Sequence, residues 1–248
     1  MTYKLRLEPQ KSQPKKKLKI VLAIPFDLSD ALCPMTTQSK LTIKTAKSIV
    51  GSLSNPSKMP CHGYSIPAVY CKVGQKMRSI KGSICSVCYA MKGRYVFKSV
   101  RAAMEQRFAS LQSDRWTSVL TWLINRKEKS GFFRWHDSGD IQSVGHLAKI
   151  AEIAKNLPHI TFWLPTREYA MVEQYMATYE KPKNLTIRLS ALMIDGPAPD
   201  AIAKRLGLPV SGVSKTSFTC PAPQQNNECK DCRACWNPEI YSISYRKH

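Results

Sequence analysis

The fold can be predicted outward from residues 132–140, which read FFRWHDSGD. The first part of this stretch, residues 132–136, is bulky and mainly apolar, as expected for a short buried strand. A polar turn, residues 137–140, follows it directly, and a helical pattern at 144–156 leads to a second apolar run at 160–164. Strand, turn, helix and strand at this spacing predict a parallel βαβ unit.

The same alternation continues toward the carboxyl terminus. We expect a helix at 170–179, a strand at 185–189 that ends at Ser190, a helix at 200–206 and an edge strand at 240–245. Upstream we expect a buried strand at 18–26, a strand at 41–43, and helices at 45–53, at 96–111 and after an N-cap at Asp114. The predicted fold is α/β, with a parallel sheet that is either open or part of a partial or complete (β/α) barrel.

Polar residues follow two of these strands where they end, and the carboxyl ends of parallel strands are where such folds bind ligands. Asp137 and Asp140 lie beside His136, and Glu168 follows the next strand. These side chains are candidate catalytic residues that could hold Mg²⁺ or Mn²⁺. The alternative is that the two aspartates are ordinary turn and N-cap residues. Three arginines are either phosphate clamps or partners of the acids: Arg134, Arg167 and Arg188.

The carboxyl-terminal cysteines follow the pattern C-P-x7-C-x2-C-x2-C. This spacing resembles that of ferredoxin-type ligands, and it favours an iron–sulfur cluster, most simply 4Fe-4S. Structural zinc is the alternative, although zinc ligands usually come as two separate C-x2-C pairs. A third interpretation is free or disulfide-bonded thiols. The candidate metal ligands here are Cys220, Cys229, Cys232 and Cys235.

A second cysteine group lies within residues 61–88. Cys71, Cys85 and Cys88 could hold a second cluster that leaves one iron open, or Cys61 could fill the fourth position. A zinc-stapled loop or simply buried free thiols are the alternatives, since there is only one C-x2-C pair.

The net charge is +21, from 38 Lys and Arg against 17 Asp and Glu. No acidic residue occurs between Ala31 and Met104, so this segment predicts a strong positive field that would bind a polyanion, DNA or RNA, by counterion release. A solvated basic face is the simpler interpretation. The candidate nucleic-acid-binding residues are Lys72, Lys76, Arg78, Lys81, Lys92, Arg94, Lys98 and Arg101.

The chain of 248 residues is long enough for one α/β domain, which we place at 18–248 after a flexible basic arm at 1–17. Its cysteine-rich segments are 61–88 and 220–235. No apolar run reaches about 18 residues, so we expect no membrane partner. The charged start, residues 1–8, does not match a secretory signal, and we expect a cytoplasmic protein with reduced thiols.

Three motifs in this order resemble a phage family called gene product 88-like: CSVCYAMKGRY at 85–95, RWHDSGD at 134–140, and the four-cysteine tail. The resemblance covers residues 55–237. It implies a phage or prophage origin, hence the host cytoplasm, and a barrel related to the radical S-adenosylmethionine fold. The chain departs from the C-x3-C-x2-C loop of those enzymes, because only Cys85 and Cys88 keep the spacing and Cys71 lies fourteen positions earlier.

Three functions fit these features. The first is an iron–sulfur protein that binds nucleic acid through a basic surface. The second is an enzyme on the same scaffold, either a metal-dependent nuclease or a radical-type modifying enzyme. The third is a zinc-stabilised interaction module.

Overall fold

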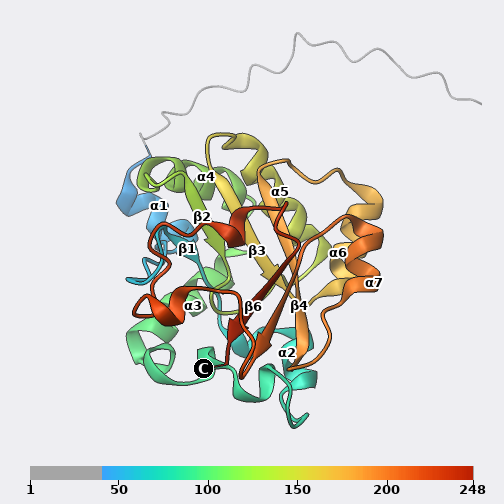
Figure 1. The fold of residues 1–248 in the computed structure, drawn as a ribbon. Helices are drawn as coiled ribbons and strands as arrows, with labels where there is room; N and C mark the ends of the chain where they lie inside the picture. The colour runs from blue at the N-terminus through green and yellow to red at the C-terminus, as the bar shows by residue number, and fades with distance from the viewer. Residues whose placement is uncertain (1–40, 248) are drawn as a thin grey trace, which may run out of the picture. The chain divides into compact units, whose positions relative to one another are not determined.

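The computed structural model describes residues 41–247, and Figure 1 shows how their helices and strands are arranged. Six strands form one sheet in which every adjacent pair is parallel, and their order in the sheet is their order in the chain. This confirms the predicted α/β class with a parallel sheet. The strands are β1 (Gly63–Tyr64), β2 (Phe132–Trp135), β3 (Thr161–Thr166), β4 (Leu185–Ile194), β5 (Val210–Ser214) and β6 (Ser242–Arg246).

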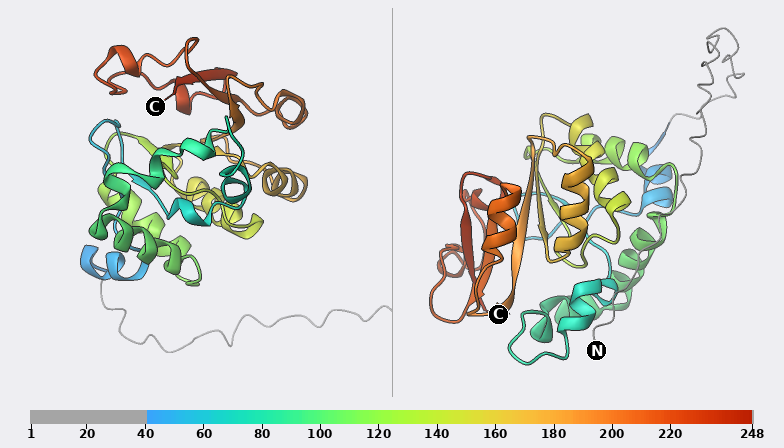
Figure 2. Two further views of the ribbon diagram at one scale, coloured as in Figure 1. Left: turned by 90° about the horizontal axis from the view of Figure 1, so that it is seen from below. Right: turned by 90° about the vertical axis from the view of Figure 1, so that its right-hand side faces the viewer.

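The unbroken strand order determines where the helices lie. Right-handed crossovers that always step in the same direction place their helices on one face of the sheet, as in (β/α) barrels. Figure 2 shows the sheet with its helices, which pack in succession as α1 on α4, α4 on α5, α5 on α6 and α6 on α7. Their bounds are α1 (Ile43–Val50), α4 (Trp116–Lys127), α5 (Val144–Asn156), α6 (Tyr169–Thr178) and α7 (Asp200–Leu206).

The side chains of the strands divide between two faces because successive residues point to opposite sides. Phe133 and Trp135 of β2 pack into the large core beneath the helices. Phe132, the first residue of β2, packs instead with Trp163 of β3 and with Trp236 from the carboxyl-terminal segment. We call this second side of the sheet the inner face.

Local capping sets one end of α5 and one end of α7. Ser143 accepts a hydrogen bond from the amide of His146 at the start of α5, and Gly207 takes a left-handed conformation after α7. The N-cap of α4 is Arg115, so the predicted cap at Asp114 is wrong by one residue. The predicted strand at 41–43 is also wrong, because Thr42 caps α1 by accepting a hydrogen bond from the amide of Thr45.

Several elements are absent from the sequence-based prediction. β1 has only two residues, and β5 contains glycine and serine in place of a continuous apolar run. β4 continues past Ser190 through an irregular pairing with β5. Helix α2 (Lys72–Met77) and the 3-10 helices η1 (Ala68–Tyr70), η2 (Cys85–Val87), η3 (Tyr89–Met91) and η4 (Gly93–Val96) precede α3 (Lys98–Ser110), the predicted helix at 96–111.

The connection from β5 to β6 contains two 3-10 helices, η5 (Ala222–Gln224) and η6 (Ala234–Trp236), and it covers part of the inner face. Trp236 donates a hydrogen bond from Nε1 to the carbonyl of Phe133 (2.9 Å) and accepts one at its own carbonyl from Thr186 (2.7 Å). The predicted strand at 18–26 and the arm at 1–17 lie outside the described residues. Within the described part, no helix is both long and apolar enough to cross a membrane.

Candidate functional site

A cavity of about 600 Å³ lies where the parallel strands end. The turn at the end of β2 contributes His136, Asp137 and Asp140, three of the predicted site residues, to its lining. Strands β3 to β6 contribute further residues from the inner face of the sheet. The two cysteine-rich segments form two other walls, which lie opposite each other. The lining from β3 to β6 includes Pro165, Arg167, Ser190, Ser211, Val213, Tyr245, Arg246 and Lys247.

The first wall carries Cys71, Cys85 and Cys88, which we call the amino-side thiols. A Cβ built on Gly74 in α2 would lie 3.8 Å from the Cys71 sulfur and 3.9 Å from the Cys85 sulfur. Residues fourteen positions apart in sequence therefore place their sulfurs beside the same turn of helix. Burial, reinforced by the charges of Asp140, Cys88 and Cys85, raises the pKa of Cys71.

This cysteine loop is tied to the sheet by hydrogen bonds on both sides of Ser83. The Ile84 amide donates to the Leu192 carbonyl (2.9 Å), and the Ile194 amide donates to the Gly82 carbonyl (3.0 Å). The hydroxyl of Ser83 donates to the Met77 carbonyl (2.6 Å). The extra length of β4 beyond Ser190 is therefore what holds the amino-side thiols at the cavity.

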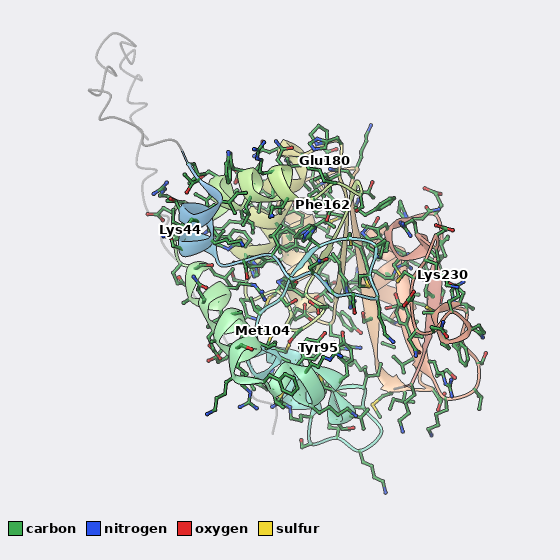
Figure 3. All side chains as sticks on the ribbon, turned by 90° about the vertical axis from the view of Figure 1, so that its left-hand side faces the viewer. Lys44, Tyr95, Met104, Phe162, Glu180 and Lys230 are labelled. Atoms are coloured by element: carbon green, nitrogen blue, oxygen red, sulfur yellow. The ribbon has the colours of Figure 1, made fainter. Side chains whose placement is uncertain are left out.

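The opposite wall carries Cys220, Cys229 and Cys235, while Cys232 lies just behind, in a smaller hollow of about 220 Å³ that Cys220 and Cys235 also line. We call these four the carboxyl-side thiols. Burial raises the pKa of Cys229, and the neighbouring thiols of Cys220 and Cys232 raise it further while Arg134 opposes them. Figure 3 shows this wall near Lys230 and the first wall near Tyr95.

Tight turns bring the carboxyl-side thiols together. Asn226, Asn227 and Lys230 all adopt left-handed backbone conformations, which asparagine tolerates better than most residues. The Cys220 amide donates to the carbonyl of Ser244 in β6 (3.0 Å), and the Cys229 amide donates to the carbonyl of Lys58 (3.1 Å). The loop is thus fastened at both ends.

Arg188 of β4 anchors the same loop to the sheet. Its side chain is fully buried, and its guanidinium donates to five backbone carbonyls. These belong to Val210, Ala234, Asn237, Ile240 and Tyr241. Two roles were considered for Arg188, phosphate clamp and partner of an acid. Neither fits, because both of its Nη groups donate hydrogen bonds to backbone carbonyls.

Arg134 of β2 lies between the two walls and lines the cavity. Its guanidinium carbon is 4.6 Å from the Trp163 ring centroid, its Nη1 is 3.6 Å from the Met59 sulfur, and its Nη2 donates to the Tyr89 hydroxyl (3.4 Å). No carboxylate lies within 4.0 Å of it among residues 41–247. Arg134 is half-buried, and Asp137 is the carboxylate that acts on it electrostatically from beyond that distance.

Cys61 does not join the amino-side thiols. It is buried in the inner-face cluster with Trp163 and Trp236. Burial, followed by the charge of Glu128, raises its pKa to about 12, and the cysteine that influences it is Cys229. The predicted alternative in which Cys61 completes the amino-side group is therefore not what the structure shows.

Asp140 forms part of the turn after β2. One carboxylate oxygen accepts hydrogen bonds from the Ile141 amide (2.8 Å) and the Thr166 hydroxyl (2.6 Å), and the other accepts one from the Arg167 amide (2.9 Å). Burial raises its pKa to about 6 although these bonds lower it. This geometry matches the turn role more closely than that of a metal ligand.

The other two predicted catalytic carboxylates differ in position, because Asp137 lines the cavity and Glu168 does not. Glu168 is buried outside the cavity lining, and its carboxylate accepts a hydrogen bond from the Val73 amide at the start of α2 (2.8 Å). Asp137 accepts a hydrogen bond from the Tyr95 hydroxyl (2.7 Å), and its backbone carbonyl accepts one from Tyr89. Neither tyrosine stands out in the sequence as a site residue, because no spacing rule points to it.

His136 has a left-handed backbone (φ 53°) at the end of β2 and is buried. Neither ring nitrogen has a hydrogen-bond partner among the described residues, and burial lowers its pKa well below the usual value. Its ring lies 5.4 Å from the ring of His146, which packs against Trp116 as expected for a core histidine. A strained backbone and free ring nitrogens in a cavity wall are typical of functional positions.

The predicted basic surface surrounds the first wall. All of its candidate residues are exposed except Arg78, which is half-buried, lines the cavity and donates to the Ala68 carbonyl (3.3 Å). Large apolar side chains are exposed on the same segment: Val69, Ile80, Val87, Met91, Val96 and Phe97. The exposed surface is therefore both basic and apolar.

None of the eight cysteines within residues 41–247 forms a disulfide bond. In that same part of the chain no three His, Cys, Asp or Glu side chains converge tightly enough to hold a metal ion. Each thiol group is instead spread around its side of the cavity.

A family model described as Gene product 88 matches residues 6–238. No curated protein and no solved structure matches the chain.

Proposed function

The chain belongs to the Gene product 88 family, and we propose that it is an iron–sulfur protein that binds nucleic acid beside a cavity containing its clusters. The main support for this proposal is that cysteines from two distant segments of the chain, 71–88 and 220–235, line one cavity. Cys71, Cys85 and Cys88 would hold one cluster, and Cys220, Cys229, Cys232 and Cys235 would hold a second.

The chemistry of the donors supports iron and sulfide. Both groups consist of thiols, which are the usual ligands of iron–sulfur clusters. A single zinc ion, with Zn–S bonds of about 2.3 Å, would need its sulfurs much closer together than a cluster does. When bound, such a cluster supplies one-electron transfer, with a reduction potential set by nearby charge and hydrogen bonds.

Arg134, which makes no direct ion pair among the described residues, supports an anionic group in the cavity. A cluster ligated by thiolates carries negative charge, and Arg134 acts electrostatically on both Cys229 and Cys235. The guanidinium would offset that charge without needing to move. Tyr245, which contacts the Cys235 sulfur through its hydroxyl (3.2 Å), would orient the same thiol.

The basic segment supports nucleic acid as the partner, DNA or RNA, in the cytoplasm of a phage host. Its candidate binding lysines and arginines are exposed, apart from the half-buried Arg78, and have no acidic residue among them in sequence. Phosphates would release counterions from this surface whichever metal the cavity holds.

A second candidate function is a radical-type modifying enzyme on the same scaffold. It is favoured by the position of Cys61, which leaves three cysteines in the amino-side group and hence one iron without a cysteine ligand. This iron would face the cavity from the carboxyl end of a parallel sheet, where (β/α) proteins carry out their chemistry.

Metal and sulfide analysis of protein purified without oxygen tests the proposal. We expect iron, acid-labile sulfide and broad absorbance near ~400 nm. Cys85→Ala and Cys232→Ala should each lose about half of the iron, because each removes a ligand of a different cluster. Cys61→Ala is the matched control, since it is a buried thiol outside both groups, and it should keep all of the iron. A colourless protein that contains only zinc would refute the proposal and leave a zinc-stabilised module.

A nuclease on this scaffold gives a separate result. Asp137→Asn would abolish cleavage that depends on Mg²⁺ or Mn²⁺ without changing oligonucleotide affinity. If cleavage needs no divalent metal, or if no cleavage occurs, the iron–sulfur interpretation stays in place.

A further inference from the structure

We propose that the surface formed by η3, η4 and the start of α3 binds single-stranded nucleic acid, with Phe97 stacking on an unpaired base. This inference rests on the proposed nucleic-acid function and specifies the strand form and the residue that recognises it. The surface comprises residues 89–101.

The first observation is the exposure of Phe97. Its side chain is 58% exposed, more than any other large apolar residue described in the chain. It lies at the start of α3, and its neighbours Val96 and Met91 are exposed as well. An apolar surface of this kind normally serves as a binding site.

The second observation is the charge around it. Lys92, Arg94, Lys98 and Arg101 are all exposed, and no acidic residue lies in the first turn of α3. A surface of exposed cations with an aromatic ring between them matches proteins that bind single strands, where cations contact phosphates and rings stack on bases. A neutral protein partner would not require so many cations without a single carboxylate, and an acidic one would offer no base for the exposed ring to stack on.

The third observation is the position of this surface beside the cavity. Tyr95, two residues before Phe97, lines the cavity and donates a hydrogen bond to Asp137 (2.7 Å). Val87 and Tyr89 also line it while reaching the exterior. A strand stacked on Phe97 would therefore run beside the cavity.

These features favour an unpaired strand over a duplex. In a duplex the base faces are covered by stacking on each other, so a ring such as Phe97 has nothing to stack on. Lysines alone would suffice to hold a duplex backbone.

Fluorescence anisotropy with labelled oligothymidylate, oligouridylate and a mixed-sequence duplex tests this inference on the full chain. Phe97→Ala should weaken single-strand binding about 5-fold or more, since stacking on one base is worth about 1–3 kcal/mol. The slope of log affinity against log salt should not change, because no phosphate contact is lost. The Lys92→Gln/Lys98→Gln variant should instead make that slope shallower by about 0.7 for each phosphate contact removed.

Tyr179→Ala is the matched control, because Tyr179 is an aromatic residue with 49% exposure at the end of α6. Its neighbour Glu180 lies at the opposite end of the molecule from Tyr95 (Figure 3). This variant should bind single strands like the wild type.

Four results would overturn the inference. Phe97→Ala could bind like the wild type, the duplex could bind as tightly as the single strands, or Tyr179→Ala could be weakened equally. Phe97→Ala could also abolish self-association while keeping oligonucleotide affinity, which would make the ring a contact between copies of the chain. If the wild type binds no oligonucleotide at low salt, the proposed nucleic-acid function fails together with the inference.

Discussion

Replacing Arg188 by methionine should detach the carboxyl-side loop from the sheet. Methionine is also long and unbranched, so it would fill most of the space and remove only the guanidinium. The five carbonyls that Arg188 now contacts would then lose its charged donor, and only those of Tyr241 and Ala234 are known to keep another, from the amides of Val210 and Asn237.

The size of the effect follows from the geometry. Three donor–acceptor distances are 2.9, 3.0 and 3.1 Å, within the normal range, whereas the other two are 3.3 and 3.4 Å and contribute less. Hydrogen bonds to charged groups contribute about 1.5 kcal/mol or more each, which gives a loss of about 4 to 5 kcal/mol for the three. A typical domain has only about 5–15 kcal/mol of stability.

Urea denaturation followed by tryptophan fluorescence measures this loss, and Trp236 lies in the segment that Arg188 holds. Iron analysis provides a second readout for the proposed clusters: iron bound by the carboxyl-side thiols should be lost while iron bound by the amino-side thiols remains. Arg115→Met is the control, because Arg115 is exposed at the start of α4, and it should change stability by less than about 0.5 kcal/mol. Wild-type stability and full iron content in Arg188→Met would refute the anchoring role.

Three further predictions test other parts of the site. Gly139→Ala should destabilise the protein by about 3 kcal/mol in urea denaturation, because Gly139 has φ 88° and its Cβ would lie 2.3 Å from the Ile66 side chain. Gly74→Ala should reduce the iron bound by the amino-side thiols, measured against total protein, because its Cβ would lie 2.7 Å from that of Cys71. His146→Asn should reduce the loss of stability on acidification. Burial lowers the pKa of His146 to about 3, so between pH 6 and 4 the unfolded chain binds a proton that the folded chain does not. In the wild type this difference lowers the free energy of unfolding by about 1.4 kcal/mol per pH unit as the pH falls.

Each of these predictions has a result that contradicts it. Wild-type stability in Gly139→Ala would show that the turn tolerates a side chain. Full iron content in Gly74→Ala would show that Cys71 is not held by the close contact with α2. An unchanged pH slope between wild type and His146→Asn would show that His146 takes up protons equally in both states. Asp140, whose pKa is raised to about 6, acts in the opposite direction over this range in both proteins and so leaves their difference unaffected.

The parallel sheet could be predicted because its central strands are apolar and each is followed by an amphipathic helix. The helices at 144–156 and 200–206 match the structure to the residue, since Ser143 and Gly207 mark a start and an end by local chemistry. β1 and β5 could not be found in this way. β1 has two residues, and β5 is recognised only through its pairing with β4 and β6.

The site shows the same division. The cysteines and the strand-end residues could be identified from spacing, but their distribution around one cavity depends on long-range contacts. Cys61 separates from Cys71 because it packs on the inner face with Trp163, which no local pattern indicates. Arg188 has the sequence surroundings of a ligand-binding arginine, and only the tertiary structure reveals that backbone carbonyls use its donors.

The sequential strand order has a consequence for how the protein is made. A ribosome releases β1 to β5 and their helices before residues 220–247, so most of the helix-side core can form while the inner face is still uncovered. The second wall of the cavity arrives last, together with β6. Any group enclosed there must consequently enter late in synthesis or after it. A chain cut short before Cys220 would keep much of its sheet, but its inner face would be uncovered and its cavity would lack one wall.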